Sequence, residues 1–221
     1  MNIELARFNM IEQQIRPWDV LDAGVLELLG VVRREDFVPP AYRALAFVDT
    51  EVPLPSPTGA LQSMLAPKVE ARMLQELAVH KHERVLEIGT GSGFMAALLA
   101  HKAQHVTTLE INPELADTAR RNLERAGVMN ATVLVADGVA GHPADAPFDV
   151  IVLSGSVFEV PDAVLDQLKP GGRLGAIVGT LPVMRAVLVT RGADGGLTRQ
   201  VLFDTVAPRL QGFGEPSRFS F

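Results

Sequence analysis

The chain has 221 residues, no cysteine and a formal net charge of -6 at pH 7. Its composition, 48% hydrophobic and 21% charged, is that of a soluble globular protein and excludes a disordered chain. The lack of cysteine excludes disulfides and thiolate metal sites, and the acidic balance argues against nucleic acid as the main partner. No apolar run reaches the roughly 20 residues that span a bilayer, and a signal-peptide pattern is missing. We therefore expect a cytoplasmic protein with no membrane partner.

Helical periodicity predicts two helices near the N-terminus, over residues 3–15 and 20–29. Pro17 ends the first, and Gly30 is a plausible C-terminal stop for the second. The first helix has four apolar residues near one face, and this face is expected to be buried. They are Ile3, Phe8, Ile11 and Ile15.

A loop and a third helix follow in the sequence. Arg33 and Arg34 are expected to lie on a solvated face. The stretch 49–59 is rich in proline and predicts an ordered, irregular loop. Pro67 can occupy the first turn of a helix that reaches about Val79.

After residue 83 the pattern changes to alternating strands and helices. Strands are expected at 84–88, 105–111, 132–136, 149–153, 173–178, 186–190 and 199–205. Helices are expected at 95–101, 112–127 and 162–168, with a turn at 169–172. Continuous apolar runs are typical of parallel strands covered on both faces. The pattern predicts an α/β fold with a doubly wound, mostly parallel, Rossmann-like sheet in one compact unit, 83–221, preceded by a helical extension, 1–82, that carries the substrate loop.

Three glycines at alternate positions, Gly89, Gly91 and Gly93, join the first of these strands to a helix. A glycine turn at a helix N-terminus lets backbone N–H groups approach a ligand closely. The dinucleotide pattern G-x-G-x-x-G needs a glycine where Phe94 stands. The spacing therefore disfavours a nicotinamide oxidoreductase.

Acidic residues stand at or near the ends of the predicted strands, where ligands bind in such sheets. Glu87 is placed to offer a carboxylate to an ammonium group, although pairing with Arg84 or Lys68 is the alternative. Glu110 is placed to accept bonds from both ribose hydroxyls. Asp137 is expected to contact adenine, with a simple turn before Gly138 as the alternative.

Together these features look like the nucleoside-binding half of a class I S-adenosylmethionine methyltransferase. The cofactor implied is S-adenosyl-L-methionine, with S-adenosyl-L-homocysteine as its product, and no metal is expected. The residues predicted to bind it are Glu87, Gly89, Thr90, Gly91, Ser92, Gly93, Glu110, Ile111, Asp137 and Gly138.

More of the chain resembles one family, the protein-L-isoaspartate O-methyltransferases. The segments MIEQQIRP at 10–17 and REDFVP at 34–39 are similar to that family's N-terminal signatures. The segment 85–93 resembles its cofactor motif. Residues 146–149 and 167–174 resemble the segments that follow that motif.

One departure from the family pattern concerns its active-site serine, which lies beside the substrate carboxylate. Leu65 stands at that position, and a leucine side chain cannot donate a hydrogen bond. Ser63 matches the family's threonine, Leu61 replaces a glycine, and an extra stretch at 56–60 lengthens the loop.

The resemblance implies carboxyl methylation of L-isoaspartyl residues in damaged proteins or peptides. We also expect a monomer or weak dimer. Ser63 and Asp49 are the candidates for substrate contact, and the alternatives are that Ser63 caps the helix at Pro67 and Asp49 caps a turn. Two other functions stay open: a methyltransferase of this fold with a different acceptor, and a cofactor-binding homologue without turnover. The tail at 212–221 carries Phe213, Phe219 and Phe221, and it is expected to pack against the protein.

Overall fold

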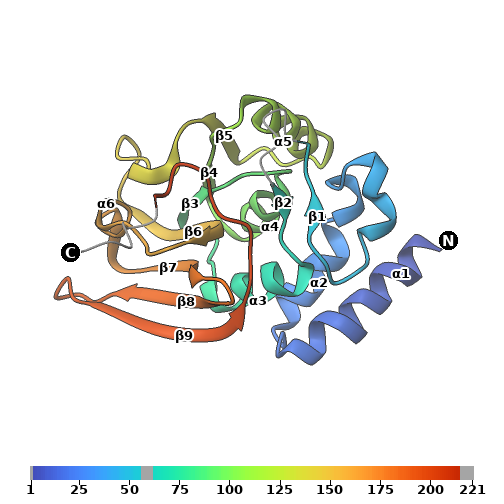
Figure 1. Ribbon diagram of the computed structural model, residues 1–221, viewed down its shortest axis with the longest axis horizontal. Coiled ribbons are helices and arrows are strands. Elements are labelled where there is room, and N and C mark those ends of the chain that lie inside the picture. The colour runs from blue at the N-terminus through green and yellow to red at the C-terminus, as the bar shows by residue number, and fades with distance from the viewer. Residues whose placement is uncertain (1, 56–61, 215–221) are drawn as a thin grey trace.

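The computed structural model describes residues 2–55 and 62–214. Its centre is a seven-stranded sheet in the order β5-β4-β3-β6-β7-β8-β9 (Figure 1). The strands are β3 (Arg84–Ile88), β4 (His105–Glu110), β5 (Ala131–Val135), β6 (Phe148–Val157), β7 (Leu168–Thr180), β8 (Val183–Arg191) and β9 (Leu197–Thr205). The first five are parallel, whereas β8 and β9 are added as antiparallel hairpins. The predicted, mostly parallel seven-stranded sheet is confirmed.

Apolar residues fill both faces of this sheet because neighbouring positions of each strand point to opposite sides. Val85, Val106 and Val150 belong to the core on one face. Leu86 and Ile151 belong to the core on the other face. This double burial explains why the strands read as continuous apolar runs.

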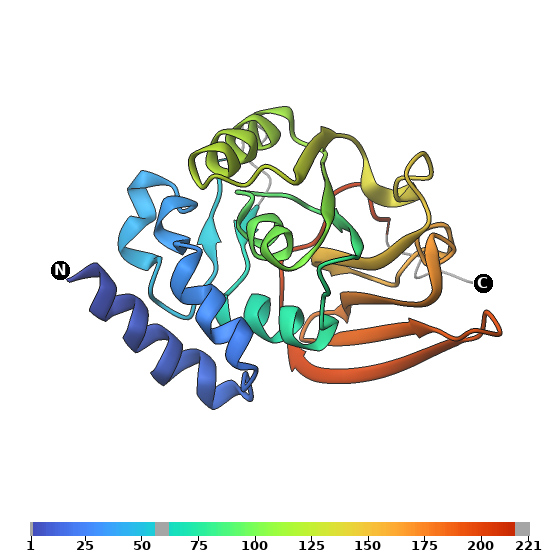
Figure 2. The ribbon, with the colours of Figure 1, turned by 180° about the vertical axis from the view of Figure 1, so that it is seen from behind.

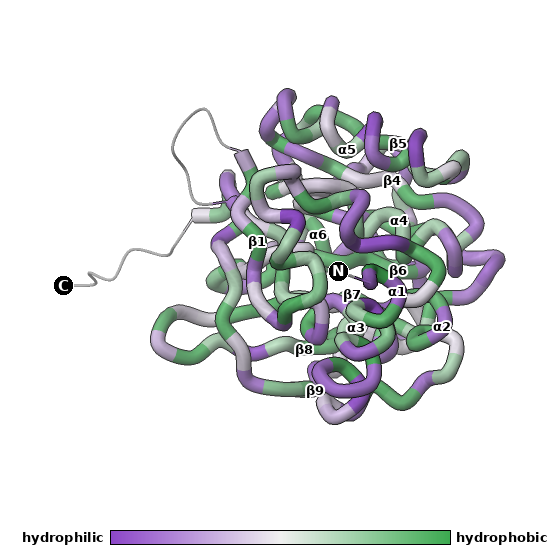
Figure 3. Tube along the Cα trace, turned by 90° about the vertical axis from the view of Figure 1, so that its right-hand side faces the viewer, coloured by the Kyte–Doolittle hydropathy of each residue, from purple (hydrophilic) through white to green (hydrophobic). Residues whose placement is uncertain are grey.

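One face is covered by a helical layer, which Figure 2 shows from behind. Its helices are α2 (Ala23–Val31), α3 (Pro67–Leu77), α4 (Phe94–Lys102) and α5 (Pro113–Arg125). The helix starts follow local chemistry: Asp22 and Asn112 accept bonds from backbone N–H groups as N-caps, and Pro67 occupies the first turn of α3. The short helix α6 (Asp162–Leu165) covers the other face. Hydrophilic positions lie along the outer side of α5 (Figure 3).

The N-terminal segment begins with α1 (Ile3–Met10), which continues as a π-helical turn (Ile11–Ile15) and a 3-10 turn (Arg16–Trp18). The predicted apolar face is wrong in its first half, because Ile3 and Phe8 are exposed. Only the C-terminal end of α1 and the π-helical turn after it reach the core, where Met10, Ile11 and Ile15 are buried. None of the helices in the described ranges is long and apolar enough to cross a membrane.

Two further helix boundaries differ from prediction. Gly30 does not end α2, which runs to Val31. The second helix begins at Ala23 rather than Val20 because Asp22 provides the cap.

Two 3-10 helices (Arg34–Asp36 and Pro40–Leu45) lead to a small hairpin of β1 (Val52–Pro53) and β2 (Ser63–Met64). The predicted solvated position is confirmed for Arg33 and wrong for Arg34, which is 1% exposed. Arg34 forms a buried ion pair with Glu70 on α3, and its guanidinium lies 5.1 Å from the centre of the Phe94 ring. The N-terminal segment is thus joined to the helical layer through a buried charge.

The predicted turn at 169–172 lies inside β7 instead of before it. Leu168 pairs with Phe148, and the register shifts before Arg173 pairs with Val150. The strand therefore starts earlier than its glycines suggested, and the glycines lie at an irregularity in the strand pairing. The predicted insertion at 56–60, Leu61 and the tail residues Phe219 and Phe221 lie outside the described residues.

Candidate cofactor and substrate site

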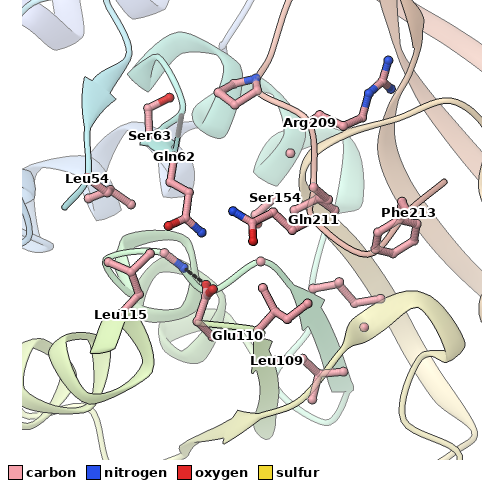
Figure 4. Close-up of a pocket in the computed structure, with 18 of the residues that line it drawn as sticks. Leu54, Gln62, Ser63, Leu109, Glu110, Leu115, Ser154, Arg209, Gln211 and Phe213 are labelled. Atoms are coloured by element: carbon pink, nitrogen blue, oxygen red, sulfur yellow. Dashed lines mark hydrogen bonds between the residues drawn. The ribbon is translucent and has the colours of Figure 1, made fainter. Parts of the chain in front are cut away.

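A cavity lies at the edge of the sheet where the parallel strands end (Figure 4). Strands run outward from β3 in both directions, to β4 and β5 on one side and to β6 and β7 on the other. Such a switch in strand order opens a crevice at the carboxyl ends, and ligands of α/β sheets bind there. The strand ends contribute Ile88, Gly89, Gly91, Leu109, Glu110, Ile111, Ala136, Gly138, Ser154 and Gly155 to the cavity wall.

The glycine loop has a backbone that only glycine adopts without strain. Gly89, Gly91 and Gly93 have φ values of 95°, 55° and 87°. A side chain on Gly93 would lie 3.3 Å from Ala119, so this glycine also lets α4 and α5 approach. The loop thereby brings its backbone to the cavity while the helices stay packed.

Glu110 is fixed at the cavity wall by two backbone N–H groups. Its carboxylate accepts a bond of 2.8 Å from Gly91 and one of 3.0 Å from Asn112. Burial raises the pKa of Glu110, and the backbone bonds, including one from Ile111, oppose that shift. Each carboxylate oxygen has a second lone pair, so Glu110 can still accept bonds from the hydroxyl groups of a ribose.

Glu87 lies behind the loop and is fully buried. Thr108 donates a bond of 2.6 Å to its carboxyl group, and Ser154 donates one of 2.7 Å. Burial raises the pKa of Glu87 to about 8, because hydration of the charged form is lost. A small space beside the loop is lined by Glu87 and Ser63, so a cation placed there would meet this carboxyl group.

The alternative partners predicted for Glu87 are engaged elsewhere, so that alternative is wrong. Arg84 donates to the backbone oxygen of Asp145, and Lys68 forms an ion pair of 2.6 Å with Asp49. The sequence alone could not predict which acid Arg84 and Lys68 would contact, because this depends on which face of each strand or helix is turned inward.

The other residues predicted to bind cofactor divide into two groups. Ile111 and Gly138 line the cavity with the residues described above. Thr90 and Ser92 lie beneath it: the Thr90 hydroxyl is 2.6 Å from the Thr108 hydroxyl, and Ser92 accepts a bond from Asn122 through its backbone oxygen. Asp137 is exposed and caps a 3-10 turn (Gly138–Ala140).

Ser63 stands where three spaces meet. It lines the cavity at the strand ends, the small space beside Glu87, and a larger groove of about 1010 Å³. Its hydroxyl donates a 3.1 Å bond to Glu51. The alternative that Ser63 caps α3 is wrong, because Ala66 occupies the N-cap position.

The other two positions of interest in this loop do not line the cavity at the strand ends. Asp49 is held by Lys68 and is absent from the residues that line these spaces. Leu65, at the family's serine position, is 7% exposed and belongs to the apolar core, and its backbone oxygen accepts a 2.8 Å bond from Arg34. The leucine therefore packs in the core, and it also lines the small space beside Glu87.

Residues 207–213 form a segment across the cavity mouth that the sequence did not predict. Ser156 donates to the Pro208 backbone oxygen at 2.7 Å, and Leu210 donates back to Ser156 at 2.9 Å. The Leu210 side chain lies over Gly89, 2.6 Å from where a β-carbon on that glycine would stand. Phe213 is buried, as predicted for the tail.

Two glutamine side chains also escaped prediction. Figure 4 shows Gln62 and Gln211 reaching into the cavity from opposite walls. With these side chains and Leu210 in place the free volume is about 60 Å³, whereas ligand pockets have about 300 Å³ or more. Gln62, Gln211 and Leu210 therefore fill much of the space at the strand ends. Gln62 adjoins Ser63 in sequence, which was the one available signal.

Comparison with known proteins gives a consistent result. The family model described as "Protein-L-isoaspartate(D-aspartate) O-methyltransferase (PCMT)" matches residues 6–206. A protein-L-isoaspartate O-methyltransferase of Methanoculleus marisnigri is 44% identical over 173 residues, 78% of this chain and 77% of that protein. One from Geobacter metallireducens is 40% identical over 200 residues, 90% of this chain and 91% of that protein.

Solved structures agree on the fold. A protein-L-isoaspartate O-methyltransferase structure superimposes with a TM-score of 0.80 at 25% identity, covering 93% of this chain and 66% of that one. A Plasmodium falciparum protein described as a putative protein-L-isoaspartate O-methyltransferase, solved with S-adenosyl-L-homocysteine, has a TM-score of 0.79 at 19% identity. That match covers 93% of this chain and 98% of the other.

Proposed function

Because the chain belongs to the protein-L-isoaspartate(D-aspartate) O-methyltransferase family, we propose that it methylates the α-carboxylate of L-isoaspartyl residues in damaged proteins and peptides. It is an S-adenosyl-L-methionine-dependent methyltransferase. The observation that carries the proposal is the match to the family over residues 6–206, which includes both the cofactor loop and the substrate loop.

The residues at the sheet edge fit the cofactor by their chemistry. S-adenosyl-L-methionine supplies a methyl group on a positively charged sulfur, together with an amino-acid group and a nucleoside. Glu110 would hold the ribose hydroxyls, and the backbone of Gly89 and Gly91 would face the bound molecule. The carboxyl group of Glu87 would meet positive charge, which favours its ionised form. Ile111 and Gly138 would flank the base.

The acceptor needs no general base from the protein. A carboxylate is already ionised at neutral pH, since its unperturbed pKa is about 4. The protein's contribution is therefore to hold the acceptor oxygen in line with the methyl group and to exclude water. Ser63 is the hydroxyl at the junction of cofactor cavity and groove, and it would donate a hydrogen bond to the acceptor carboxylate. Leu65 borders the small space beside Glu87 and can offer it only an apolar surface.

The test is transfer of labelled methyl from S-adenosyl-L-methionine to an isoaspartyl peptide, with the matched aspartyl peptide as control. We expect base-labile label on the isoaspartyl peptide alone. A Leu65→Ser variant run in parallel is expected to bring no new activity. Cofactor binding without labelling of the isoaspartyl peptide would refute the proposal, and activity gained only with the added serine would show that the chain has moved to another acceptor.

A further inference from the structure

A second pocket lies beside the cofactor cavity, between the N-terminal segment and α5. Its free volume is about 310 Å³, at the lower end of the range for sites that bind small molecules. Buried apolar side chains form part of its wall, and they include Phe37, Leu54 and Leu115. Leu54 and Leu115 also line the cavity at the strand ends, so the two spaces share a wall.

Three arginine side chains line the same pocket. Arg43 comes from the 3-10 helix Pro40–Leu45, and Arg121 and Arg125 come from α5. None of the three forms an ion pair with a carboxylate among the described residues, whereas most other arginines of the described ranges do. The chain has 26 acidic and 20 basic residues, so a shortage of acids does not explain this gathering of unpaired cations.

The acids closest in sequence to this pocket are engaged with other arginines. Asp36 lines the pocket, but its carboxylate accepts a 2.9 Å bond from Arg33. Asp117, one turn before Arg121 on α5, forms an ion pair with Arg120. The positive charge of the pocket is therefore left for a ligand to neutralise.

The two arginines of α5 are oriented by neutral partners. Arg125 donates a 3.2 Å bond to the Asp36 backbone oxygen and another bond to the Asn122 side chain. Arg121 donates a 2.9 Å bond to the Thr118 hydroxyl. A guanidinium has five N–H donors, so several donors on each arginine remain for a ligand. Like charges one helical turn apart repel, and a bound anion would relieve this repulsion between Arg121 and Arg125.

We propose that this pocket binds a small organic phosphate. Its phosphate group is held by Arg43, Arg121 and Arg125, and its apolar or aromatic body packs on Phe37 and Leu115. The planar fork of a guanidinium matches the oxygens of a phosphate. A phosphate monoester carries nearly two negative charges at pH 7, which suits three arginines better than the single charge of a carboxylate. This inference goes beyond the proposed function, because binding here requires no methyl transfer.

Phenyl phosphate is the probe, because it combines one aromatic ring with one phosphate group. It is titrated at constant ionic strength while amide NMR shifts are followed, with S-adenosyl-L-homocysteine present to fill the cofactor site. We expect saturable shifts at Phe37 and Thr118. Affinity should be about fivefold or more above that of inorganic phosphate, since the ring adds apolar burial. Benzoate, which has the ring but one charge, should bind about fivefold or more weakly than phenyl phosphate.

Arg43→Gln and Arg121→Gln each remove one exposed charge, and each should weaken phenyl phosphate binding about fivefold or more. Arg199→Gln is the matched control, because this exposed arginine on β9 does not line the pocket, and its affinity should equal that of the unmodified protein. Three results would overturn the inference: no saturable shifts at the pocket, equal affinity for inorganic phosphate or benzoate, or equal weakening by Arg199→Gln. Each of them would leave the proposed function standing.

Discussion

Two carboxyl groups at the glycine loop are held in different ways. Glu110 receives backbone N–H bonds at the cavity wall, whereas Glu87 is surrounded by side-chain hydroxyls and is fully buried. The first arrangement fixes acceptor oxygens in a set direction. The second keeps a neutral carboxyl group that is ready to lose its proton when positive charge arrives.

The role of Glu110 can be tested by replacing its carboxyl group with an amide. In Glu110→Gln, one acceptor oxygen becomes an amide nitrogen, which cannot accept from Gly91, Asn112 or a ribose hydroxyl. We expect cofactor affinity to fall about 10- to 100-fold, equivalent to about 1.4–3 kcal/mol. Titration calorimetry with S-adenosyl-L-homocysteine measures this, and Glu114→Gln, on the outside of α5, is the control. Unchanged affinity would exclude Glu110 from the cofactor site.

Glu87 should make the free protein less stable as pH rises. Its folded pKa is about 8 and its ordinary pKa is 4.5, so between these values the folded state holds a proton that the unfolded chain releases. Its stabilising contribution is complete below about pH 4.5 and is lost as pH rises through about 8. Glu70, raised by burial to about 7, adds to the effect below that pH.

The measurement is urea unfolding of the free protein at pH 5, 6, 7 and 8. Glu87→Gln stays neutral throughout, so its decline in unfolding free energy should be shallower than that of the unmodified protein by up to about 1.4 kcal/mol per pH unit. Parallel curves for the two proteins would mean that Glu87 is ionised in the fold across this range.

The glycine loop and the place of Glu110 at a strand end could be predicted from the sequence. Both depend on residues that are neighbours in the chain: an apolar strand followed by glycines, and an apolar strand that ends in an acid. The partners of Glu87 and the buried state of Arg34 could not be predicted in this way. Both depend on contacts between residues far apart in the chain: Arg34 meets Glu70, and Glu87 meets Thr108 and Ser154.

Two segments from outside the parallel sheet complete the wall of the site. The β1–β2 hairpin brings Ser63, and residues 207–213 cross the mouth. Strands were predictable since their apolar runs are buried on both faces. The covering segment was not, because it has no periodic pattern and is held by irregular bonds to Ser156.

Ser156 is the anchor of the covering segment. Its buried hydroxyl donates a 2.9 Å bond to the Ala207 backbone oxygen, so Ser156→Ala leaves that oxygen without this donor. We expect a loss of about 1 kcal/mol in the stability of the segment and roughly fivefold faster amide exchange at Leu210. Hydrogen exchange followed by mass spectrometry measures it, with Thr198→Ala on β9 as control. Equal exchange in both variants would show that the segment is held by other contacts.

At the scale of the whole molecule, the N-terminal segment and the sheet share one core. Buried apolar residues form a continuous cluster from Met10 through α3 and α4 to the strands. Arg34 adds a buried ion pair with Glu70 to this contact. The substrate loop is therefore connected on both sides to elements that belong to this shared core.

Arg34→Ala should destabilise the entire protein. It leaves Glu70 buried without its cation, and breaking a buried pair in this way costs about 3–5 kcal/mol. Chemical unfolding should still show a single transition, at lower denaturant concentration. Arg33→Ala, which removes an exposed arginine, should change stability by about 0.5 kcal/mol or less. A second unfolding transition, in which the N-terminal segment unfolds before the sheet, would contradict the shared core.

If this protein methylates the α-carboxylate of isoaspartate, the isoaspartyl residue itself should be converted to aspartate. An α-methyl ester is activated for succinimide formation, and hydrolysis of the succinimide returns part of the peptide to normal aspartate. An isoaspartyl peptide incubated with the protein and S-adenosyl-L-methionine should therefore yield the aspartyl peptide over time, measured by chromatography. We expect conversion that requires both protein and cofactor. An isoaspartyl peptide that stays unconverted while the cofactor is bound would contradict it.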